Sequence, residues 1–426
     1  MSTSTALSPV YPLGSRLNER GRLEVGGCDV IELAREFGTP AFVVAEEDLR
    51  SRARAFVAAG RARHQDFQVV FASKAFPARA VLELFAQEGL WCDVASGGEL
   101  HLALQAGFAA ERIVLHGNAK SRAELATALR ERVGLIVIDN LSELERLREL
   151  IADGALPPDR GPQSVLIRVA PGVSGDTHQK ISTGQSRSKF GFSMLDAPAA
   201  IEAVQSVDGL ALVGLHAHIG SQLLELPPFA ESAAALAGLG AFPVYDLGGG
   251  LGVAYTADQH PPSIEDYVAA NVQALHDHAG TNARLLIEPG RSLVANGCVT
   301  LYTVESLKRN VDLWVAVDGG MSDNLRPMLY DARYEAEVAD RFGGEAACVL
   351  AGKHCESGDV IVRHAHLDDP RPGDIVVTPA TGAYGHAMAN NYNGVPRPPV
   401  IFCRDGEARV VVRRETYDDL QARDVR

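Results

Sequence analysis

One lysine stands at the end of a short apolar run. Lys74 closes the segment QVVFASK at 68–74. Apolar surroundings disfavour a charged ammonium, and a neutral amine can then condense with an aldehyde. The alternative is a lysine whose stem covers apolar surface while its charge stays in water. Lys74 is therefore a candidate for covalent chemistry through its amine.

Two glycine-containing loops offer a site for an anion. The first is a glycine triplet after the run VYDL: Gly248, Gly249 and Gly250. Successive backbone N–H groups in such a loop can converge on a phosphate. Gly290 and Arg291 follow another apolar run, and Ser221 follows a third. A tight turn that needs positive φ is the alternative for one such loop, but two loops together favour phosphate.

A carboxylate and two histidines lie on or after other apolar runs. Glu288 ends the run LLIE, where a carboxylate can keep a pyridine nitrogen protonated; a structural salt bridge is the alternative. His216 and His218 are two residues apart on a predicted strand and share a face. No third ligand stands at a companion spacing, so we predict no metal site. One ring can instead stack on a flat cofactor, and the other is then a core histidine.

Two later segments carry further candidates. KHCESGD at 353–359 places Cys355 beside Glu356 between glycines, which is typical of an exposed loop. A buried and inert cysteine is the alternative. TGAYGHAMANNYNG at 381–394 is richer in glycine, asparagine and tyrosine than a simple connection needs. This composition indicates a loop that binds a ligand.

The elements that must position these residues alternate between strand and helix. Eight β-rich runs, separated by amphipathic or apolar helical patterns, predict a (β/α)8 barrel. In such a barrel the strand ends carry the chemistry, and the loops after strands seven and eight commonly hold phosphate. A doubly wound sheet is disfavoured, because no G-x-G-x-x-G turn follows any run. The runs are 68–74, 91–96, 112–118, 135–140, 164–170, 212–220, 243–250 and 285–290.

The pattern changes after Gly290. The β-rich runs that follow have no helices between them, which predicts a β-sandwich or small β-barrel. The run TPAFVVA at 39–45 precedes the first barrel strand, and we expect it to join that second domain. The predicted organisation is a barrel at 46–294 and a discontinuous β domain, at 12–45 and 295–426, that completes the active site.

Composition excludes several classes of function. The 426 residues include 40 Lys and Arg against 54 Asp and Glu, a formal net charge of −14, and no long basic cluster. We therefore expect neither a nucleic acid nor a membrane as partner. The N-terminal segment lacks the pattern of a secretory signal, so we expect a cytoplasmic protein. None of the six cysteines has a zinc-like spacing, and we expect free thiols.

Taken in order, these blocks resemble the fold-type III pyridoxal-phosphate decarboxylases. The resemblance extends from about residue 70 to residue 394, and the set is far more specific than any one block. The matching blocks are FASKA, DVASGGEL, HGNAK, STGQSRSKFG, HAHIGSQ, DLGGGLG, EPGRS, VDGGMSDNLRPMLY, GKHCESGD and TGAYGHAMANNYNG.

The resemblance implies a role for each candidate. Lys74 would bind pyridoxal 5'-phosphate covalently, His218 would stack on its ring, and Glu288 would pair with the pyridine nitrogen. Tyr384 would also contact the cofactor. The phosphate would be held by Ser221, Gly248, Gly249, Gly250, Gly290 and Arg291. The family also implies a homodimer in which a second subunit brings Cys355 and Glu356 into the active site, with Cys355 as proton donor.

The same resemblance implies a substrate with an acidic far end. Arg291 and Arg326 would bind the distal carboxylate beside Tyr330, with Tyr384 at the substrate as well, and Glu356 would receive the distal ammonium. A planar guanidinium suits a carboxylate, and meso-2,6-diaminopimelate has one at its far end whereas lysine and ornithine do not. Decarboxylation of diaminopimelate to L-lysine is thus the expected reaction.

Three alternatives remain. A sibling decarboxylase could act on ornithine, lysine or a specialised-metabolite intermediate. A non-catalytic pyridoxal-phosphate carrier would resemble the barrel alone, and an amino-acid racemase is disfavoured by the blocks EPGR and CESGD. One local departure is expected: the segment between His218 and Tyr245 holds a single short helical run, so the sixth barrel helix is predicted to be truncated.

Overall fold

The computed structural model describes residues 7–157, 161–173 and 188–425. Most of the block STGQSRSKFG, at 182–187, lies outside the described residues. Two compact units make up the chain. One comprises Arg52–Gly252 and Pro261–Arg291, and we call it the barrel unit. The other, the β unit, comprises Met1–Ser51, Val253–His260 and Ser292–Arg426.

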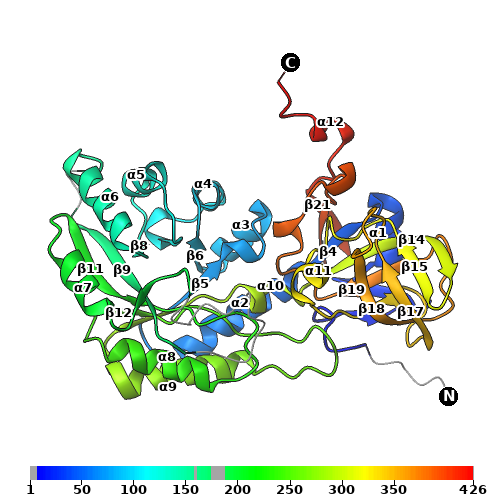
Figure 1. Ribbon diagram of the computed structural model, residues 1–426. Coiled ribbons are helices and arrows are strands. Elements are labelled where there is room, and N and C mark those ends of the chain that lie inside the picture. The colour runs from blue at the N-terminus through cyan, green and yellow to red at the C-terminus, as the bar shows by residue number, and fades with distance from the viewer. Residues whose placement is uncertain (1–6, 158–160, 174–187, 426) are drawn as a thin grey trace. The chain divides into compact units, whose positions relative to one another are not determined.

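The barrel unit is a closed ring of eight parallel strands, as predicted (Figure 1). Each neighbouring pair is hydrogen-bonded, and β8 pairs with β9 while β13 pairs with β5, which completes the ring. A short strand, β10 (Phe192–Ser193), adds to β9 outside the ring. The ring strands are β5 Phe67–Ala72, β6 Trp91–Val94, β7 Ile113–Leu115, β8 Leu135–Ile138, β9 Gln163–Ala170, β11 Leu210–His216, β12 Val244–Asp246 and β13 Arg284–Ile287.

Aliphatic side chains from these strands form a buried core cluster. Because successive strand residues point to opposite faces, one residue in two meets its counterparts from the other strands. The cluster contains Val70, Val114, Leu135, Val137, Leu166, Val244 and Leu286. Six of the eight ring strands contribute to it, so the same packing that closes the ring also fixes where each strand ends.

Helices follow most strands and begin at side-chain caps. Ser96, Ser121 and Asn140 each accept a hydrogen bond from the third backbone N–H of the helix they precede, which satisfies a donor that the helix cannot. The helix between His218 and Tyr245 is α8, whose 11 residues make it no shorter than α3, α4, α5 and α7. The barrel helices are α2 Glu46–Arg61, α3 Arg79–Gln87, α4 Gly97–Gln105, α5 Arg122–Glu131, α6 Leu141–Ala152, α7 Ala197–Gln205, α8 Pro227–Ala237 and α9 Ile264–Ala279.

The β unit is built on a mixed sheet with the order β18-β17-β15-β14-β4-β20-β21. The early strand β4 (Ala41–Ala45) lies between β14 (Cys298–Arg309), to which it is antiparallel, and β20 (Val400–Arg404), to which it is parallel. In Figure 1 this blue strand lies among strands of yellow to red colour. The expectation that 39–45 joins the second unit is thereby confirmed.

The rest of the β unit consists of short elements around that sheet. β19 pairs with both β14 and β16, and β1, β2 and β3 form a small separate sheet ahead of α1. Among the described residues, none of the helices combines the length and apolar character needed to span a bilayer. The remaining elements are β1 Arg16–Leu17, β2 Leu23–Val25, β3 Cys28–Asp29, α1 Val30–Phe37, α10 Arg291–Val294, β15 Leu313–Val317, α11 Arg326–Tyr330, β16 Glu337–Val338, β17 Ala346–Ala351, β18 Val360–Leu367, β19 Ile375–Pro379, β21 Glu407–Val412 and α12 Tyr417–Leu420.

Candidate functional site

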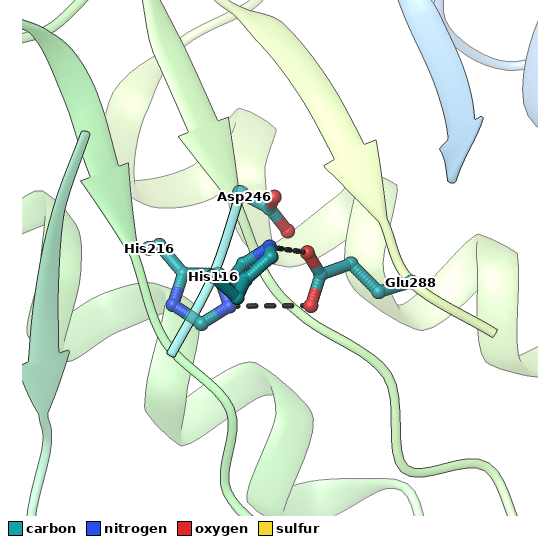
Figure 2. A group of neighbouring side chains, drawn as sticks. All are labelled: His116, His216, Asp246 and Glu288. Atoms are coloured by element: carbon teal, nitrogen blue, oxygen red, sulfur yellow. Dashed lines mark hydrogen bonds and ion pairs between the residues drawn. The ribbon is translucent and has the colours of Figure 1, made fainter. Parts of the chain in front are cut away.

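Four buried polar side chains converge at the carboxyl ends of the barrel strands (Figure 2). His116 follows β7, His216 ends β11, Asp246 ends β12 and Glu288 follows β13. One ligand atom from each lies within 4.8 Å of the others. Parallel strands place all their carboxyl ends on one rim, so residues far apart in sequence meet there. We call these four residues the rim cluster.

The centre of the rim cluster is the Glu288 carboxylate, which is 5% exposed. Its Oε1 lies 2.6 Å from Nε2 of His116, and its Oε2 lies 3.2 Å from Nε2 of His216. Figure 2 shows one imidazole facing each carboxylate oxygen. Both contacts are made by ring nitrogens, and no Lys or Arg pairs with Glu288 within the described residues.

Burial and neighbouring charges shift the pKa values of the rim-cluster residues in different directions. Burial favours the neutral acid, but the two histidines outweigh it and hold the pKa of Glu288 well below its usual value. Burial lowers the pKa of His216 to about 4, so that ring is neutral at pH 7. Burial and the charge of Glu288 raise the pKa of Asp246 well above its usual value. Within this pair the surroundings thus favour the charged form of Glu288 and the neutral form of Asp246.

Lys74 and His218 lie in the same neighbourhood. The charge of Lys74 is one of the influences on the pKa of both Asp93 and His218, although burial is the largest for each: it raises the pKa of Asp93 to about 6 and lowers that of His218. Lys74 itself lies in the 3-10 turn η1 (Ser73–Ala75) beyond β5 and is exposed. The expectation that an apolar strand surrounds its amine was therefore wrong, because the strand ends at Ala72.

The glycine triplet packs tightly against its neighbours. A Cβ on Gly248 would lie 2.4 Å from the carbonyl oxygen of Ala217, and one on Gly249 would lie 2.1 Å from that of Glu288. Only glycine allows such close approach. The N–H of Gly248 donates to Asp246 and that of Gly249 to Nδ1 of His218. Two of the three amides predicted to face an anion are thus already engaged within the protein.

Those internal bonds still help to form a binding surface. Because Gly249 donates to Nδ1, the neutral His218 ring carries its proton on Nε2. Gly290 is buried, and a Cβ there would lie 3.0 Å from that of Ala72. The guanidinium of Arg291 donates to Ser221 Oγ, with its Nη2 at 2.8 Å. A hydroxyl and a guanidinium therefore meet next to a glycine-lined surface.

In the β unit, Asp359 ties together two of the recognised blocks. Its Oδ1 accepts from the Met321 N–H at 2.7 Å, and its Oδ2 accepts from the backbone N–H of His354 at 2.9 Å. The same oxygen lies 2.8 Å from Nδ1 of His354. The carboxylate is buried, so these donors compensate for its lost hydration. Cys355 and Glu356 follow directly and are exposed.

The loop at 381–394 supports Cys355 from a second direction. Asn393 Oδ1 accepts from the Cys355 N–H at 2.9 Å, and the rings of His354 and Tyr392 stack at 5.8 Å. Tyr384 has φ of 67°, a left-handed conformation that is uncommon for tyrosine and typical of strained functional positions.

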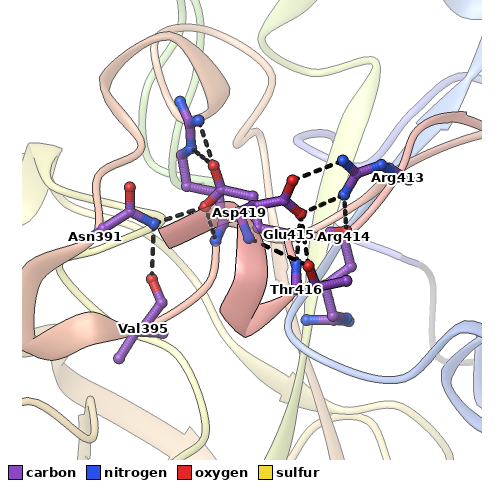
Figure 3. Close-up of polar contacts among 8 residues, drawn as sticks. Asn391, Val395, Arg413, Arg414, Glu415, Thr416 and Asp419 are labelled. Atoms are coloured by element: carbon purple, nitrogen blue, oxygen red, sulfur yellow. Dashed lines mark hydrogen bonds and ion pairs between the residues drawn. The ribbon is translucent and has the colours of Figure 1, made fainter. Parts of the chain in front are cut away.

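The same end of this loop is also anchored by the C-terminal segment (Figure 3). Glu415 accepts from the side chain of Asn391 at 2.6 Å and from the Arg397 N–H at 2.9 Å. Hydrogen bonds from Arg397 lower the pKa of Glu415 to about 2. The part of the loop that contacts Cys355 is thus held by the C-terminal segment as well.

Arg326 begins α11 and is 4% exposed, with Tyr330 half-buried at the other end of that helix. Its guanidinium lies 4.4 Å above the ring of Tyr255 and hydrogen-bonds the hydroxyl of Tyr334. Its Nε has no hydrogen-bond partner, and within the described residues no carboxylate pairs with it. A buried cation without an anion is costly, so this guanidinium is suited to a ligand that brings a carboxylate.

Each unit thus brings together part of the predicted site. Three carboxylates that organise these surroundings, Asp93, Asp246 and Asp359, were not predicted. A signal was present, because Asp93 and Asp246 each interrupt an apolar strand. The barrel unit holds Lys74, His218, Ser221, Gly248, Gly249, Gly250, Glu288, Gly290 and Arg291. The β unit holds Arg326, Tyr330, Cys355, Glu356 and Tyr384.

Comparison with known proteins decides the family. Residues 47–295 match the family model described as pyridoxal-dependent decarboxylase, pyridoxal binding domain. The chain belongs to the pyridoxal-dependent decarboxylases. Its relatives include the diaminopimelate decarboxylase of Bacillus subtilis, 44% identical over 95% of this chain and 96% of that protein, and that of Actinosynnema pretiosum, 46% identical over 98% and 95%. The solved structure of the M. jannaschii diaminopimelate decarboxylase with L-lysine aligns at a TM-score of 0.89 with 32% identity, over 96% of this chain and 97% of that one.

The side chains at the barrel rim of this decarboxylase have the chemistry that binding of pyridoxal phosphate requires. Glu288 is a buried carboxylate without a Lys or Arg partner among the described residues, as a pyridinium nitrogen requires. The glycine triplet packs so closely against Ala217 and Glu288 that no side chain would fit beside the Glu288 carboxylate's own segment. Arg291 and Ser221 offer donors for a phosphate, and Lys74 offers an exposed amine.

Replacing Gly249 tests the glycine surface. A Cβ 2.1 Å from the Glu288 carbonyl oxygen must push apart the segments after β12 and β13. We expect Gly249→Ala to weaken pyridoxal-phosphate affinity by about 10-fold or more, as measured by titrating the apoprotein with cofactor. Gly161→Ala is the control, because nothing lies within 4 Å of a Cβ there. Equal affinity for the two variants would refute the role of the triplet.

Proposed function

We infer that this protein is a pyridoxal-phosphate-dependent carboxy-lyase that converts meso-2,6-diaminopimelate to L-lysine and carbon dioxide, the last step of lysine biosynthesis. Relatives at 44% and 46% identity over nearly the whole chain bear the name diaminopimelate decarboxylase. The related M. jannaschii enzyme has been solved with L-lysine, which is the product of this reaction.

The observation that carries the choice of substrate is Arg326. This buried guanidinium has a free Nε and no carboxylate partner within the described residues. Diaminopimelate retains a second carboxylate, far from the reacting carbon, that can pair with it. Lysine and ornithine would leave the charge buried and unpaired. We propose that Arg326, with Arg291 and Tyr330, binds that distal carboxylate, and that Glu356 receives the distal ammonium.

The residues of the barrel unit bind and orient the cofactor. Pyridoxal phosphate, when bound, accepts the electron pair that decarboxylation releases. Lys74 would hold it covalently through the amine, and Glu288 would pair with the pyridine nitrogen as a carboxylate. His218, whose Nδ1 is engaged by Gly249, presents its ring face to the cofactor. Ser221, Arg291 and the glycine loops hold the phosphate, and Tyr384 contacts both cofactor and substrate.

Cys355 is the proposed proton donor to the α-carbon. It is the exposed member of six free cysteines, and its loop is held by Asp359 and Asn393. We propose that it acts together with Glu356 in the active site of a second subunit, so that the functional unit is a homodimer. In this proposal the barrel domain is 46–294 and the β domain is 12–45 with 295–426. Six free thiols suit the reducing cytoplasm.

Substrate turnover tests the reaction directly. The purified protein with pyridoxal phosphate should show the absorbance of a lysine-bound cofactor and release carbon dioxide from meso-diaminopimelate, but not from lysine or ornithine. Lys74→Ala should abolish both signals, because the covalent amine is lost. Release from lysine or ornithine alone would assign a sibling activity, whereas a bound cofactor without any release would indicate a non-catalytic carrier.

Arg326→Leu tests the substrate assignment separately. Loss of a guanidinium–carboxylate pair should reduce kcat/KM for diaminopimelate by about 100-fold or more, corresponding to roughly 3 kcal/mol. Cofactor absorbance should be unchanged, because the proposed role concerns only the substrate. Arg333→Leu, which removes an exposed arginine paired with Asp258, is the control. An unchanged kcat/KM in Arg326→Leu would exclude this arginine from substrate binding.

Mixed dimers test the shared active site. Lys74→Ala and Cys355→Ala proteins should each be nearly inactive. Unfolding and refolding them together at equal amounts should restore about a quarter of wild-type activity, since half the dimers are mixed and each of those has one intact site. Sites built from a single chain would give no recovery, and full activity of Cys355→Ala would remove it as the proton donor.

A further inference from the structure

The proposed function requires Glu288, but it does not explain why two histidines surround it. His116 and His216 come from different strands, and each places Nε2 against a different oxygen of the same carboxylate. Their rings meet edge to face, 4.8 Å apart at an angle of 63°. Figure 2 shows the two rings next to each other, both facing the Glu288 carboxylate, with Asp246 nearby.

A carboxylate this deeply buried is costly unless donors replace its hydration. The described residues bring no Lys or Arg to Glu288. The Nε2 of His216 hydrogen-bonds Oε2, and the Nε2 of His116 lies 2.6 Å from Oε1 as a close ion-pair contact, so the two imidazoles are the groups that can compensate this charge. The neutral His216 can serve as a donor only with its proton on Nε2, and its Nδ1 has no hydrogen-bond partner within the described part of the chain.

His116 is held by a buried ion pair below it. Lys120 Nζ donates to the carbonyl oxygen of Gly117 at 2.6 Å, pairs with Glu143 Oε1 at 2.8 Å and donates to the carbonyl oxygen of Val137 at 2.8 Å. Lys120 and Glu143 are both buried, so the loop that follows β7 is fixed from inside the protein. The residue that this loop directs toward Glu288 is His116.

A metal ion is the competing explanation. Two ring nitrogens and two carboxylates within 4.8 Å of one another could act as ligands. However, the candidate ligand atoms already have partners: both oxygens of Glu288 face imidazole nitrogens, and Asp246 Oδ1 accepts from the N–H of Gly248 at 2.9 Å. A cation on Glu288 would also compete with the pyridinium that the proposed function places there.

We propose that His116 and His216 act as a pair of positioning residues that hold Glu288 ionised and aimed at the pyridine nitrogen of the cofactor. This inference rests on the proposed function. Neither histidine needs to touch the substrate, and each acts through Glu288. Loss of either ring should therefore weaken cofactor binding and the chemical step but leave substrate affinity nearly unchanged.

The test compares substitutions that keep or remove the donor. In glutamine the amide nitrogen lies about where Nε2 lies in histidine, whereas asparagine is too short and leucine has no donor. We expect His116→Leu, His216→Leu and the two asparagine variants to raise the cofactor Kd and lower kcat on the order of 10- to 100-fold, with KM for diaminopimelate changed less than about 3-fold. The glutamine variants should recover most of both losses. If leucine prevents folding, the asparagine and glutamine pairs still make the comparison.

His64→Leu is the control for the histidine variants. His64→Leu removes another buried histidine of the barrel unit, whose Nε2 lies 2.8 Å from the carbonyl oxygen of Ala283. If the His116 and His216 variants have the same cofactor Kd and kcat as this control, the proposed role of the two histidines is wrong. Stoichiometric metal in the purified protein that is lost in His216→Leu would also overturn it. If the wild-type protein binds no pyridoxal phosphate, both proposals fail; if it decarboxylates diaminopimelate normally, only the histidine proposal is at risk.

Discussion

A buried carboxylate is the constraint on which the barrel unit depends. Glu288 is ionised although it is 5% exposed, and a charge so placed requires partners that water would otherwise supply. The partners come from separate strands: His116 after β7 and His216 at the end of β11. Ring closure, the buried Lys120–Glu143 pair and the tight glycine triplet all serve to hold these strand ends at fixed positions.

The β unit also contains a buried carboxylate, which is stabilised by backbone N–H donors. Asp359 accepts hydrogen bonds from N–H groups at 321 and 354, so one buried carboxylate joins two loops that are distant in sequence. Cys355 remains exposed on the surface of that arrangement. The contrast with Arg326 is informative, since its guanidinium is buried without an anion in the described chain. Buried carboxylates with donors thus build the scaffold, whereas the buried Arg326 guanidinium, without a carboxylate among the described residues, is suited to a ligand.

The sequence pattern predicted the strands and their assignment to the two units correctly. All eight predicted barrel runs contain strands, and the early strand at 39–45 lies in the second sheet, because apolar runs of this length have few other stable arrangements. The pattern could not predict which side chains are buried or which groups they hydrogen-bond. Lys74 lies beyond its strand and is exposed, and the amides of Gly248 and Gly249 donate to Asp246 and His218, two partners that the spacing of the glycines does not reveal.

The order of the recognised blocks and the alternation of strand and helix were enough to determine the barrel, the second β-rich unit and most of the candidate residues. Only the tertiary structure showed that His116 and Asp246 join His216 around Glu288, and that Arg326 is buried without an anion. The physical reason is that spacing along a chain fixes which face of a strand a residue occupies. Protonation state and charge balance depend on burial and on neighbours from distant strands, which closure of the ring alone brings together.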